Sequence, residues 1–204
     1  MEVRIISATE KPIDVISLAA GTSYGKDNVS LKRVETCVKH GHTSVIEHAY
    51  ITFRIDGISR ACSHQLVRHR LASYVQASQR YCKYQDLVDN KDWYVVPPSI
   101  RENSTRLKTF ENEMNHAALS YSLLLDMGVK AEDARYVLGN AAKTSITMSM
   151  NPREFFGFLD LRLSPKAQWE IRELAENMRW LAEHYNEQWA QLMQIYTNNQ
   201  QLVN

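Results

Sequence analysis

Residues 49–56, AYITFRID, alternate between apolar and polar positions. The apolar side chains fall at every second residue: Ala49, Ile51, Phe53 and Ile55. A period of two is typical of a strand that buries one face and exposes the other. This stretch therefore predicts a β-strand, and the patterns on either side of it decide the fold class.

Before this strand, the sequence predicts two helices, at residues 11–20 and 28–40. The second ends at Gly41, and Lys39 and His40 in its last turn suit the negative end of a helix. After the strand we expect one short helix and two further strands, at residues 58–67, 73–81 and 92–96.

The second half of the chain is more helical. One apolar stripe has helical spacing and comprises Leu107, Phe110, Met114, Ala117, Tyr121 and Leu124. Gly128 follows and is predicted to end this helix. We expect a short helix around residues 131–139 and a β-segment near 144–150.

Two further helices have clear start signals. Asn151-Pro152-Arg153-Glu154 combines an N-cap residue, proline at the first helical position and glutamate at the third. Ser164-Pro165 is predicted to start the other, whose apolar residues recur in steps of three and four: Ile171, Leu174, Met178, Leu181 and Tyr185. Helices interrupted by strands make an α+β fold. Because no linker or repeat divides the sequence, we expect one domain over residues 1–204.

The composition is that of an ordinary globular protein and excludes a disordered or fibrous chain. Of 204 residues, 24 are Lys or Arg, 23 are Asp or Glu, and 44% are hydrophobic. The opening residues do not resemble a signal peptide, and no apolar run approaches the ~18 residues of a membrane span. Cys37, Cys62 and Cys82 show no C-x-x-C spacing, so we interpret them as reduced thiols of the cytoplasm.

Cationic side chains concentrate around the predicted strand. Residues 54–83 carry Asp56 as their only acid and six cations: Arg54, Arg60, Arg68, Arg70, Arg80 and Lys83. Adjacent guanidinium groups can hold a phosphate or diphosphate through several hydrogen bonds, although an ion-paired surface is the alternative. The strongest local signal is Arg68-His69-Arg70, followed after seven residues by Ser78. We interpret Ser78 as a hydrogen-bond donor to a ligand, because no base and acid at a recognisable spacing would activate it as a nucleophile.

Other functional motifs are weaker. Residues 21–26 are one residue short of a P-loop, and the G-x-G-x-x-G, H-E-x-x-H and G-x-S-x-G patterns are absent from the sequence. Clustered histidines could ligate a metal together with Glu47, but they match no known ligand spacing, so we expect no metal site: His40, His42 and His48, with His64 or His69.

Arg68-His69-Arg70-(x7)-Ser78, within SHQLVRHRLASYVQASQRY, resembles the signature of the flavin-dependent thymidylate synthases, the ThyX family. Three further blocks resemble that family: GHTSVIEHAYITFRI, EDARYVLG and NPREFFGFLDLRLSPKAQWEIR. Together these segments cover most of residues 40–172.

The resemblance implies an α+β domain with an antiparallel sheet flanked by long helices, in a cytoplasmic homotetramer whose sites are shared between subunits. The implied cofactor is FAD, and the implied substrates are deoxyuridine monophosphate (dUMP), methylenetetrahydrofolate and NADPH. In the family's reaction NADPH reduces FAD, the folate supplies one carbon, and the reduced flavin supplies the hydride that completes the methyl group of thymidylate (dTMP). No metal, nucleic acid, membrane or cysteine nucleophile is implied.

The resemblance also assigns residues. The implied FAD contacts, with His42 and Glu47 close by, are Ser44, Arg68, His69, Arg70, Gln76, Asn151, Arg153 and Gly157. The implied dUMP contacts are Gln65, Leu66, Val67, Arg68, Gln76, Ala77, Ser78, Gln79, Arg80, Arg135 and Arg162. Arg162 is the implied catalytic residue, because a guanidinium facing the uracil ring stabilises negative charge there.

Three positions depart from the family pattern. Val75-Gln76 stands where many members have Asn-Glu, Gly157 where Asn or His is common, and Lys166 where some have His. The alternative function is a nucleic-acid-binding module that uses residues 54–83, with Tyr74 and Tyr81 as stacking platforms.

Overall fold

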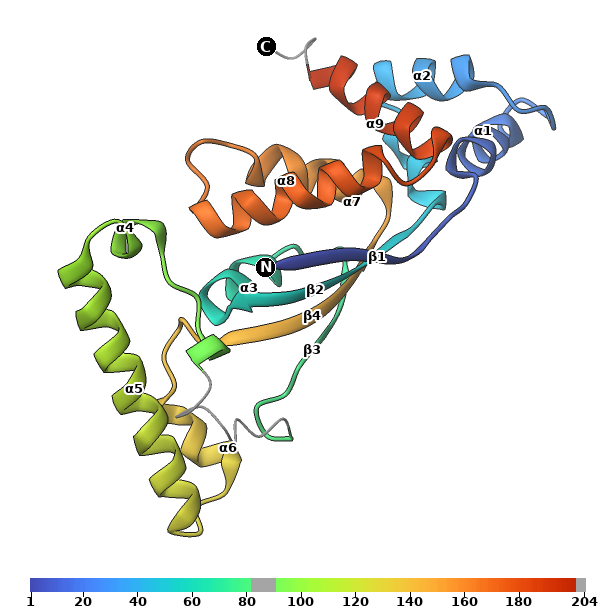
Figure 1. Ribbon diagram of the computed structural model, residues 1–204. Coiled ribbons are helices and arrows are strands. Elements are labelled where there is room, and N and C mark those ends of the chain that lie inside the picture. Colours follow the sequence, from blue (N-terminus) through green and yellow to red (C-terminus); the bar gives the residue numbers. More distant parts are fainter. Residues whose placement is uncertain (82–90, 201–204) are drawn as a thin grey trace. The chain divides into compact units, whose positions relative to one another are not determined.

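A computed structural model describes residues 1–81 and 91–200 (Figure 1). Four strands form an antiparallel sheet in the order β1-β2-β4-β3. Their bounds are β1 (Glu2–Ala8), β2 (Ile51–Ser59), β3 (Ser73–Gln76) and β4 (Lys143–Met150). The predicted α+β fold, with an antiparallel sheet and long helices, is confirmed. Cys82 and Lys83 lie outside the described residues.

The chain divides into two compact units, and the strands run from one into the other. The first comprises residues 1–55, 67–74 and the chain from Thr147 onward, and the second comprises residues 56–66 and 75–146. A single domain over residues 1–204 therefore stays a prediction.

Most of the buried apolar side chains that belong to helices lie in the first unit. Its helices are α1 (Pro12–Thr22), α2 (Leu31–Lys39), the 3-10 helix η1 (Thr43–His48), α7 (Pro152–Arg162), α8 (Trp169–Glu183) and α9 (Glu187–Gln200). Helix α8 packs against β1, α7 and α9, and Figure 1 shows α7 and α8 side by side. Phe53 of β2 contacts Phe155 of α7, with ring centroids 5.6 Å apart, and both side chains are fully buried.

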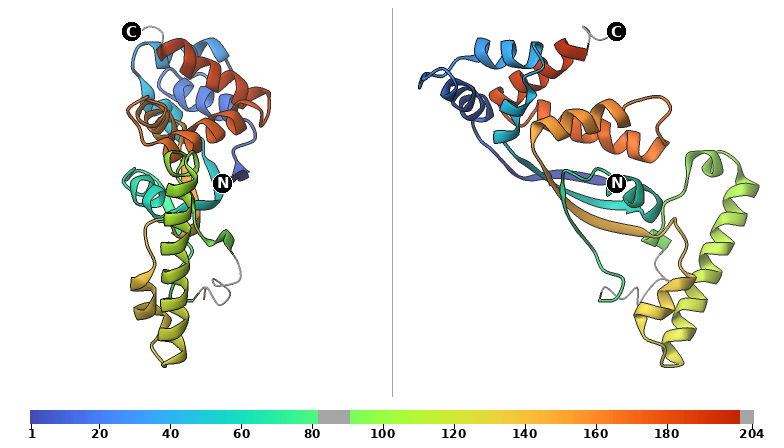
Figure 2. Two further views of the ribbon diagram at one scale, coloured as in Figure 1. Left: turned by 60° about the vertical axis from the view of Figure 1, so that its left-hand side comes forward. Right: turned by 180° about the vertical axis from the view of Figure 1, so that it is seen from behind.

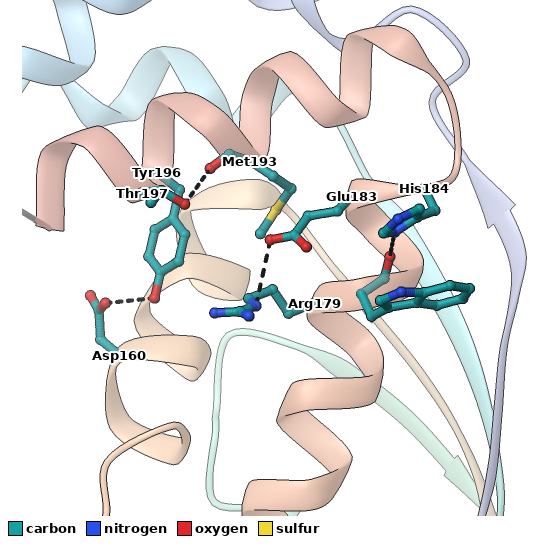
Figure 3. A network of polar contacts seen from close by, with 8 residues as sticks. Asp160, Arg179, Glu183, His184, Met193, Tyr196 and Thr197 are labelled. Atoms are coloured by element: carbon teal, nitrogen blue, oxygen red, sulfur yellow. Dashed lines mark hydrogen bonds and ion pairs between the residues drawn. The ribbon is translucent and has the colours of Figure 1, made fainter.

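The C-terminal helix α9 is fastened to α7. The Tyr196 hydroxyl donates a hydrogen bond to Asp160 Oδ1 at 2.9 Å (Figure 3), and its ring stacks on Phe156 with centroids 4.7 Å apart. Burial and the Asp160 carboxylate both raise the pKa of Tyr196, so the phenol stays protonated as the donor. These contacts hold α9 against α7 through Asp160 and Phe156.

The second unit is built on α5 (Ser104–Asp126), the long green helix of Figure 2. Its other helices are α3 (Arg60–Leu66), η2 (Lys91–Trp93), α4 (Pro98–Arg101), α6 (Ala131–Ala134) and η3 (Arg135–Val137). Tyr121 of α5 packs with Trp93, Tyr94 and Ala134 in one buried cluster. Asn103 caps α5 by accepting hydrogen bonds from the N–H groups of Thr105 and Arg106, both at 3.0 Å.

Most predicted elements are confirmed, including the end of α5 before Gly128, whose φ of +84° lies in the left-handed region. Residues Ile51, Phe53 and Ile55 are fully buried, as their alternation predicts. The strand spans Ile51–Ser59, so it starts two residues later and ends three residues later than predicted; its alternation of buried residues breaks at Gly57, whose φ is +76°.

Several predicted boundaries are wrong. The strand at 73–81 ends at Gln76, because Ser78 Oγ accepts the Arg80 N–H at 3.2 Å and the chain turns. The strand at 92–96 is replaced by η2 and a single bridge between Tyr94 and Ala142, since Trp93 and Tyr94 pack into the cluster under α5.

Two helical predictions also need correction. The helix expected at Ser164-Pro165 begins at Trp169, where Gln168 Oε1 accepts from the N–H groups of Glu170 and Ile171. The helix expected at 131–139 splits into α6 and η3. Helix α9 corresponds to no prediction.

Candidate functional site

The first unit contains a cavity of about 470 Å³ at the start of α7. Segments far apart in the sequence line it: Glu47, Tyr50, Arg70, Leu71, Ala72, Ser73, Ser149, Asn151, Arg153 and Glu154. Three residues predicted for FAD therefore lie together, namely Arg70, Asn151 and Arg153, and Glu47 lies beside them. We call this space the α7 cavity.

Local structure explains how α7 presents these groups. Asn151 Oδ1 accepts the N–H of Glu154 at 3.0 Å, so the predicted cap starts the helix. The positive end of the 11-residue helix α7 thus lies at the cavity. Such an end suits an anionic ligand group.

The two arginines of the α7 cavity differ in their partners. Arg153 Nη1 lies 2.5 Å from Glu47 Oε1, so a carboxylate already balances its charge. Arg70 is exposed and has no ion-pair partner among residues 1–81 and 91–200. Arg70 is therefore the cation best able to meet an incoming phosphate or diphosphate.

Six residues of the α7 cavity were missed by the sequence predictions: Tyr50, Leu71, Ala72, Ser73, Ser149 and Glu154. Tyr50 occupies a polar position of the alternation that predicted β2, and Ser149 lies among the partly exposed residues of β4. The Ser149 hydroxyl shares a hydrogen bond of 2.9 Å with Thr52. Strand alternation was the signal that could have placed Tyr50 and Ser149 on a solvent-facing surface.

Arg162 and His69, predicted for different ligands, contact each other directly. Arg162 Nε donates to His69 Nε2 at 3.0 Å. Burial, and secondarily the Arg162 charge, lower the pKa of His69 to about 4. The imidazole is therefore neutral at physiological pH.

The second unit contains a smaller cavity of about 270 Å³. It is lined by Arg60, His64, Gln79, Arg135, Leu138, Gly139 and Asn140. Gln79 and Arg135 were predicted for dUMP, whereas Arg60 was only counted among the cations of residues 54–83 and His64 was only named as a possible metal ligand. We call this space the α3 cavity, because Arg60 and His64 belong to α3.

The α3 cavity has the donors of an anion site. Arg60 Nε is buried and has no hydrogen-bond partner within the described part of the chain. The guanidinium groups of Arg60 and Arg135 both belong to residues that line this space, and such groups suit an anionic oxygen. The count of cations in residues 54–83 was the sequence signal for Arg60.

Glu132 holds two of the arginines predicted for dUMP. Its carboxylate Oε2 lies 2.7 Å from Arg80 Nε, and its main-chain oxygen accepts from Arg135 Nε at 2.9 Å. Arg80 also lies over the Tyr81 ring, 5.6 Å from the centroid. Glu132 was not predicted, and nothing in its local sequence distinguishes it from a surface acid.

Gln76 and Ser78 have local partners. Gln76 Nε2 donates to the hydroxyls of Ser63 at 2.9 Å and Thr144 at 3.2 Å, so this end of the amide is engaged within the second unit. Ser78 Oγ accepts the N–H of Arg80, which leaves the serine hydrogen available as a donor.

The remaining predicted residues lie outside the two cavity linings. Ser44, Arg68 and Gly157 are exposed, and a Cβ added at Gly157 meets no atom within 4 Å. Gln65 and Leu66 end α3, where Leu66 is fully buried, and Val67 is 40% exposed. Ala77 donates its N–H to the Ser145 carbonyl at 2.8 Å.

The structure can also be compared with the alternatives raised by the sequence, a metal site and a nucleic-acid-binding module. In residues 1–81 and 91–200, no three His, Cys, Asp or Glu side chains come together as metal ligands. Of the two tyrosines of the nucleic-acid alternative, Tyr74 is half-buried and donates its hydroxyl to the His69 carbonyl, whereas Tyr81 is exposed. No helix of the described residues is both long and apolar enough to cross a bilayer.

Residues 4–186 match the model of the Thy1 family, described as thymidylate synthase complementing protein. The chain belongs to this family. The flavin-dependent thymidylate synthase of Geobacter sulfurreducens is 43% identical over 191 residues, covering 87% of this chain and 80% of the relative. That of Pyrococcus horikoshii is 40% identical over 189 residues, covering 87% and 77%.

A solved structure supports the same relationship. ThyX from Helicobacter pylori, crystallised with FAD and dUMP, matches with a TM-score of 0.67 and 28% identity. The match covers 89% of this chain and 93% of that one. The resemblance inferred from the sequence motifs is thereby confirmed.

Proposed function

We propose that the chain is a flavin-dependent thymidylate synthase, which binds FAD and methylates the uracil ring of dUMP to give dTMP. The family match over residues 4–186 carries this proposal, because it includes every side chain that lines the α7 and α3 cavities. The FAD and dUMP of the Helicobacter pylori crystal structure support the same ligands here.

The α7 cavity fits an FAD diphosphate. Arg70 would pair with the phosphates, because its charge is unbalanced in the described chain, and Asn151 and Arg153 would bind beside it. When bound, FAD would supply the redox chemistry that passes reducing equivalents from NADPH to the substrate. Gly157 can contribute only its backbone, since it has no side chain.

The α3 cavity fits the phosphate of dUMP. The Arg60 and Arg135 guanidinium groups and the Gln79 amide supply donors around one space. Glu132 orients Arg80 and Arg135, which lowers the entropy lost when they bind a ligand.

Arg162 would act on the uracil ring. A planar guanidinium can donate to a ring oxygen and stabilise the charge that develops when C5 becomes nucleophilic. Because its Nε is engaged with His69, the contact with uracil would use the terminal nitrogens.

The family resemblance supports further features of the proposal. Methylenetetrahydrofolate would supply the one-carbon unit, and NADPH would be the reductant. We also infer a homotetramer with sites shared between subunits, and a cytoplasmic location.

The test uses purified wild-type protein. We expect the protein to show a flavin absorption spectrum that changes when dUMP is added, and to release the flavin on denaturation. We also expect dTMP formation that requires the folate and NADPH. Arg162→Ala should lower dTMP formation by roughly 10²–10³-fold, far more than flavin reduction. Arg162→Lys should restore little activity, because an ammonium group lacks the planar fork.

The matched control is Arg179→Ala. Arg179 is a surface arginine 3.5 Å from Glu183, one helical turn away, and its loss should leave turnover nearly unchanged. Full dTMP formation by Arg162→Ala would remove Arg162 from the chemistry. A colourless protein with strongly salt-dependent oligonucleotide affinity would support the nucleic-acid alternative instead.

A further inference from the structure

His69 and Arg162 form a hydrogen bond whose direction is fixed by chemistry. The arginine Nε always carries a hydrogen, so His69 Nε2, 3.0 Å away, is the acceptor. An imidazole that accepts at Nε2 carries its proton on Nδ1 and is neutral. The contact therefore specifies both the charge and the tautomer of His69.

The His69 ring is held in place from two further sides. Its edge meets the Phe158 ring, with centroids 5.0 Å apart and the planes at 72°. Phe158 is fully buried and lies one helical turn before Arg162 on α7, so both contact His69 from the same face of that helix. The Tyr74 hydroxyl donates to the His69 main-chain oxygen at 2.9 Å and fixes the backbone.

The electrostatics favour the same state. Burial and the neighbouring guanidinium hold the pKa of His69 at about 4, against the ordinary 6.5. Burial raises the pKa of Tyr74 to about 12, although Arg162 opposes that rise, so Tyr74 remains a donor. Arg162 from α7 and Tyr74 from β3 are the charged or titratable groups that the structure relates to His69 among the described residues. Protonated His69 would set two cations against each other at hydrogen-bond distance.

We propose that His69 is a positioning residue, whose neutral imidazole aims the Arg162 guanidinium at the nucleotide. This inference rests on the proposed function in one respect, because it takes from that function the role of Arg162 on the uracil ring. It adds a second role to a residue that the resemblance assigns to FAD, and it links the flavin residues to the catalytic arginine through one hydrogen bond. A displaced guanidinium loses rate because the donor no longer meets the developing charge.

The first test is spectroscopic and needs no activity. Imidazole nitrogen shifts of the ¹⁵N-labelled holoprotein, with the His69 signal assigned from a His69→Gln sample, should report the Nδ1–H tautomer. The His69 signal should not titrate between about pH 5 and 8, and its pKa should rise in Arg162→Ala. An Nε2–H tautomer, or the same pKa in wild type and Arg162→Ala, overturns the proposal.

The second test compares variants at matched FAD content. His69→Leu removes the acceptor and should lower dTMP formation by roughly 10–10²-fold, with a smaller effect on flavin reduction by NADPH. His69→Gln retains an acceptor and should recover most of that loss. In an Arg162→Ala background, His69→Leu should add little, because the two residues act as a unit. His116→Gln, at an exposed histidine of α5, is the matched control.

The outcomes separate the two proposals. Equal loss in His69→Leu and His69→Gln, confined to FAD affinity, would make His69 a flavin contact alone and overturn the positioning role. A wild type that forms no dTMP refutes the proposed function, and the nitrogen shifts still decide whether His69 holds Arg162.

Discussion

Replacing Arg70 by alanine should weaken FAD binding while leaving the fold intact. Arg70 lines the α7 cavity, is exposed, and has no ion-pair partner among the described residues, so its loss breaks no ion pair there. Loss of a charge-assisted hydrogen bond costs ~1.5–3 kcal/mol. At 1.4 kcal/mol per factor of ten, the FAD dissociation constant should rise roughly 12- to 140-fold.

Mass action converts this change into a thermal shift. At an FAD concentration of 100 times the wild-type dissociation constant, bound FAD stabilises the wild type by about 2.7 kcal/mol. The same concentration should stabilise Arg70→Ala by only ~0.3–1.3 kcal/mol. The measurements are flavin titration of FAD-free protein and melting temperature with and without FAD.

The control for Arg70→Ala is a second arginine variant, measured by the same FAD titration. Arg4→Ala removes an exposed arginine of β1 that does not line the cavity, and it should leave FAD affinity unchanged. Wild-type FAD affinity in a folded Arg70→Ala protein would show that Arg70 does not bind the cofactor.

Three further predictions concern stability, pH and chemistry. Asn103→Ala removes the acceptor for two N–H groups at the start of α5 and should lower the free energy of unfolding by ~1 kcal/mol, measured by urea denaturation; an unchanged midpoint would contradict the capping role. Because the pKa of His69 is lowered to about 4, its stabilising contribution is present above pH 6.5 and is lost as the pH falls from 6.5 through about 4. His69→Gln should therefore flatten the loss of stability over that range relative to His116→Gln, and parallel curves would argue against it. A variant in which Cys37, Cys62 and Cys82 are replaced by serine or alanine should still form dTMP, with folding checked because Cys62 is fully buried; a folded but inactive variant would point to covalent catalysis.

The sequence predicted elements correctly where a single local signal, such as strand alternation or a helix cap, determined the backbone. The alternation at residues 49–56 and the cap at Asn151 each gave the element found in the structure. Predictions failed where a side chain competed with the backbone pattern. Ser78 turned the chain out of the predicted strand, and Gln168 started α8 later than Ser164-Pro165 suggested.

The candidate site was predictable in its motif residues and not in their partners. Arg70, Asn151 and Arg153, which the resemblance assigned to FAD, line one cavity, and their contact with FAD stays a prediction. Glu132 was not predicted and Arg60 was only counted among the cations of residues 54–83, because their partners lie far along the chain. The contact between His69 and Arg162 spans 93 residues of sequence, and no local pattern encodes it.

Helix α7 also sets the distance between Arg153, proposed to bind FAD, and Arg162, proposed to act on the uracil ring. Arg153 lies in its first turn and Arg162 is its last residue, and nine residues at 1.5 Å each separate them by about 13.5 Å along the axis. Asn151 caps the start of α7, and the Tyr196 hydroxyl donates to Asp160 near its end. One residue inserted between the two arginines would shift Arg162 by about 1.5 Å and rotate it by about 100° about the axis. Such an insertion should therefore remove the Arg162 guanidinium from His69 even though every side chain of α7 is kept.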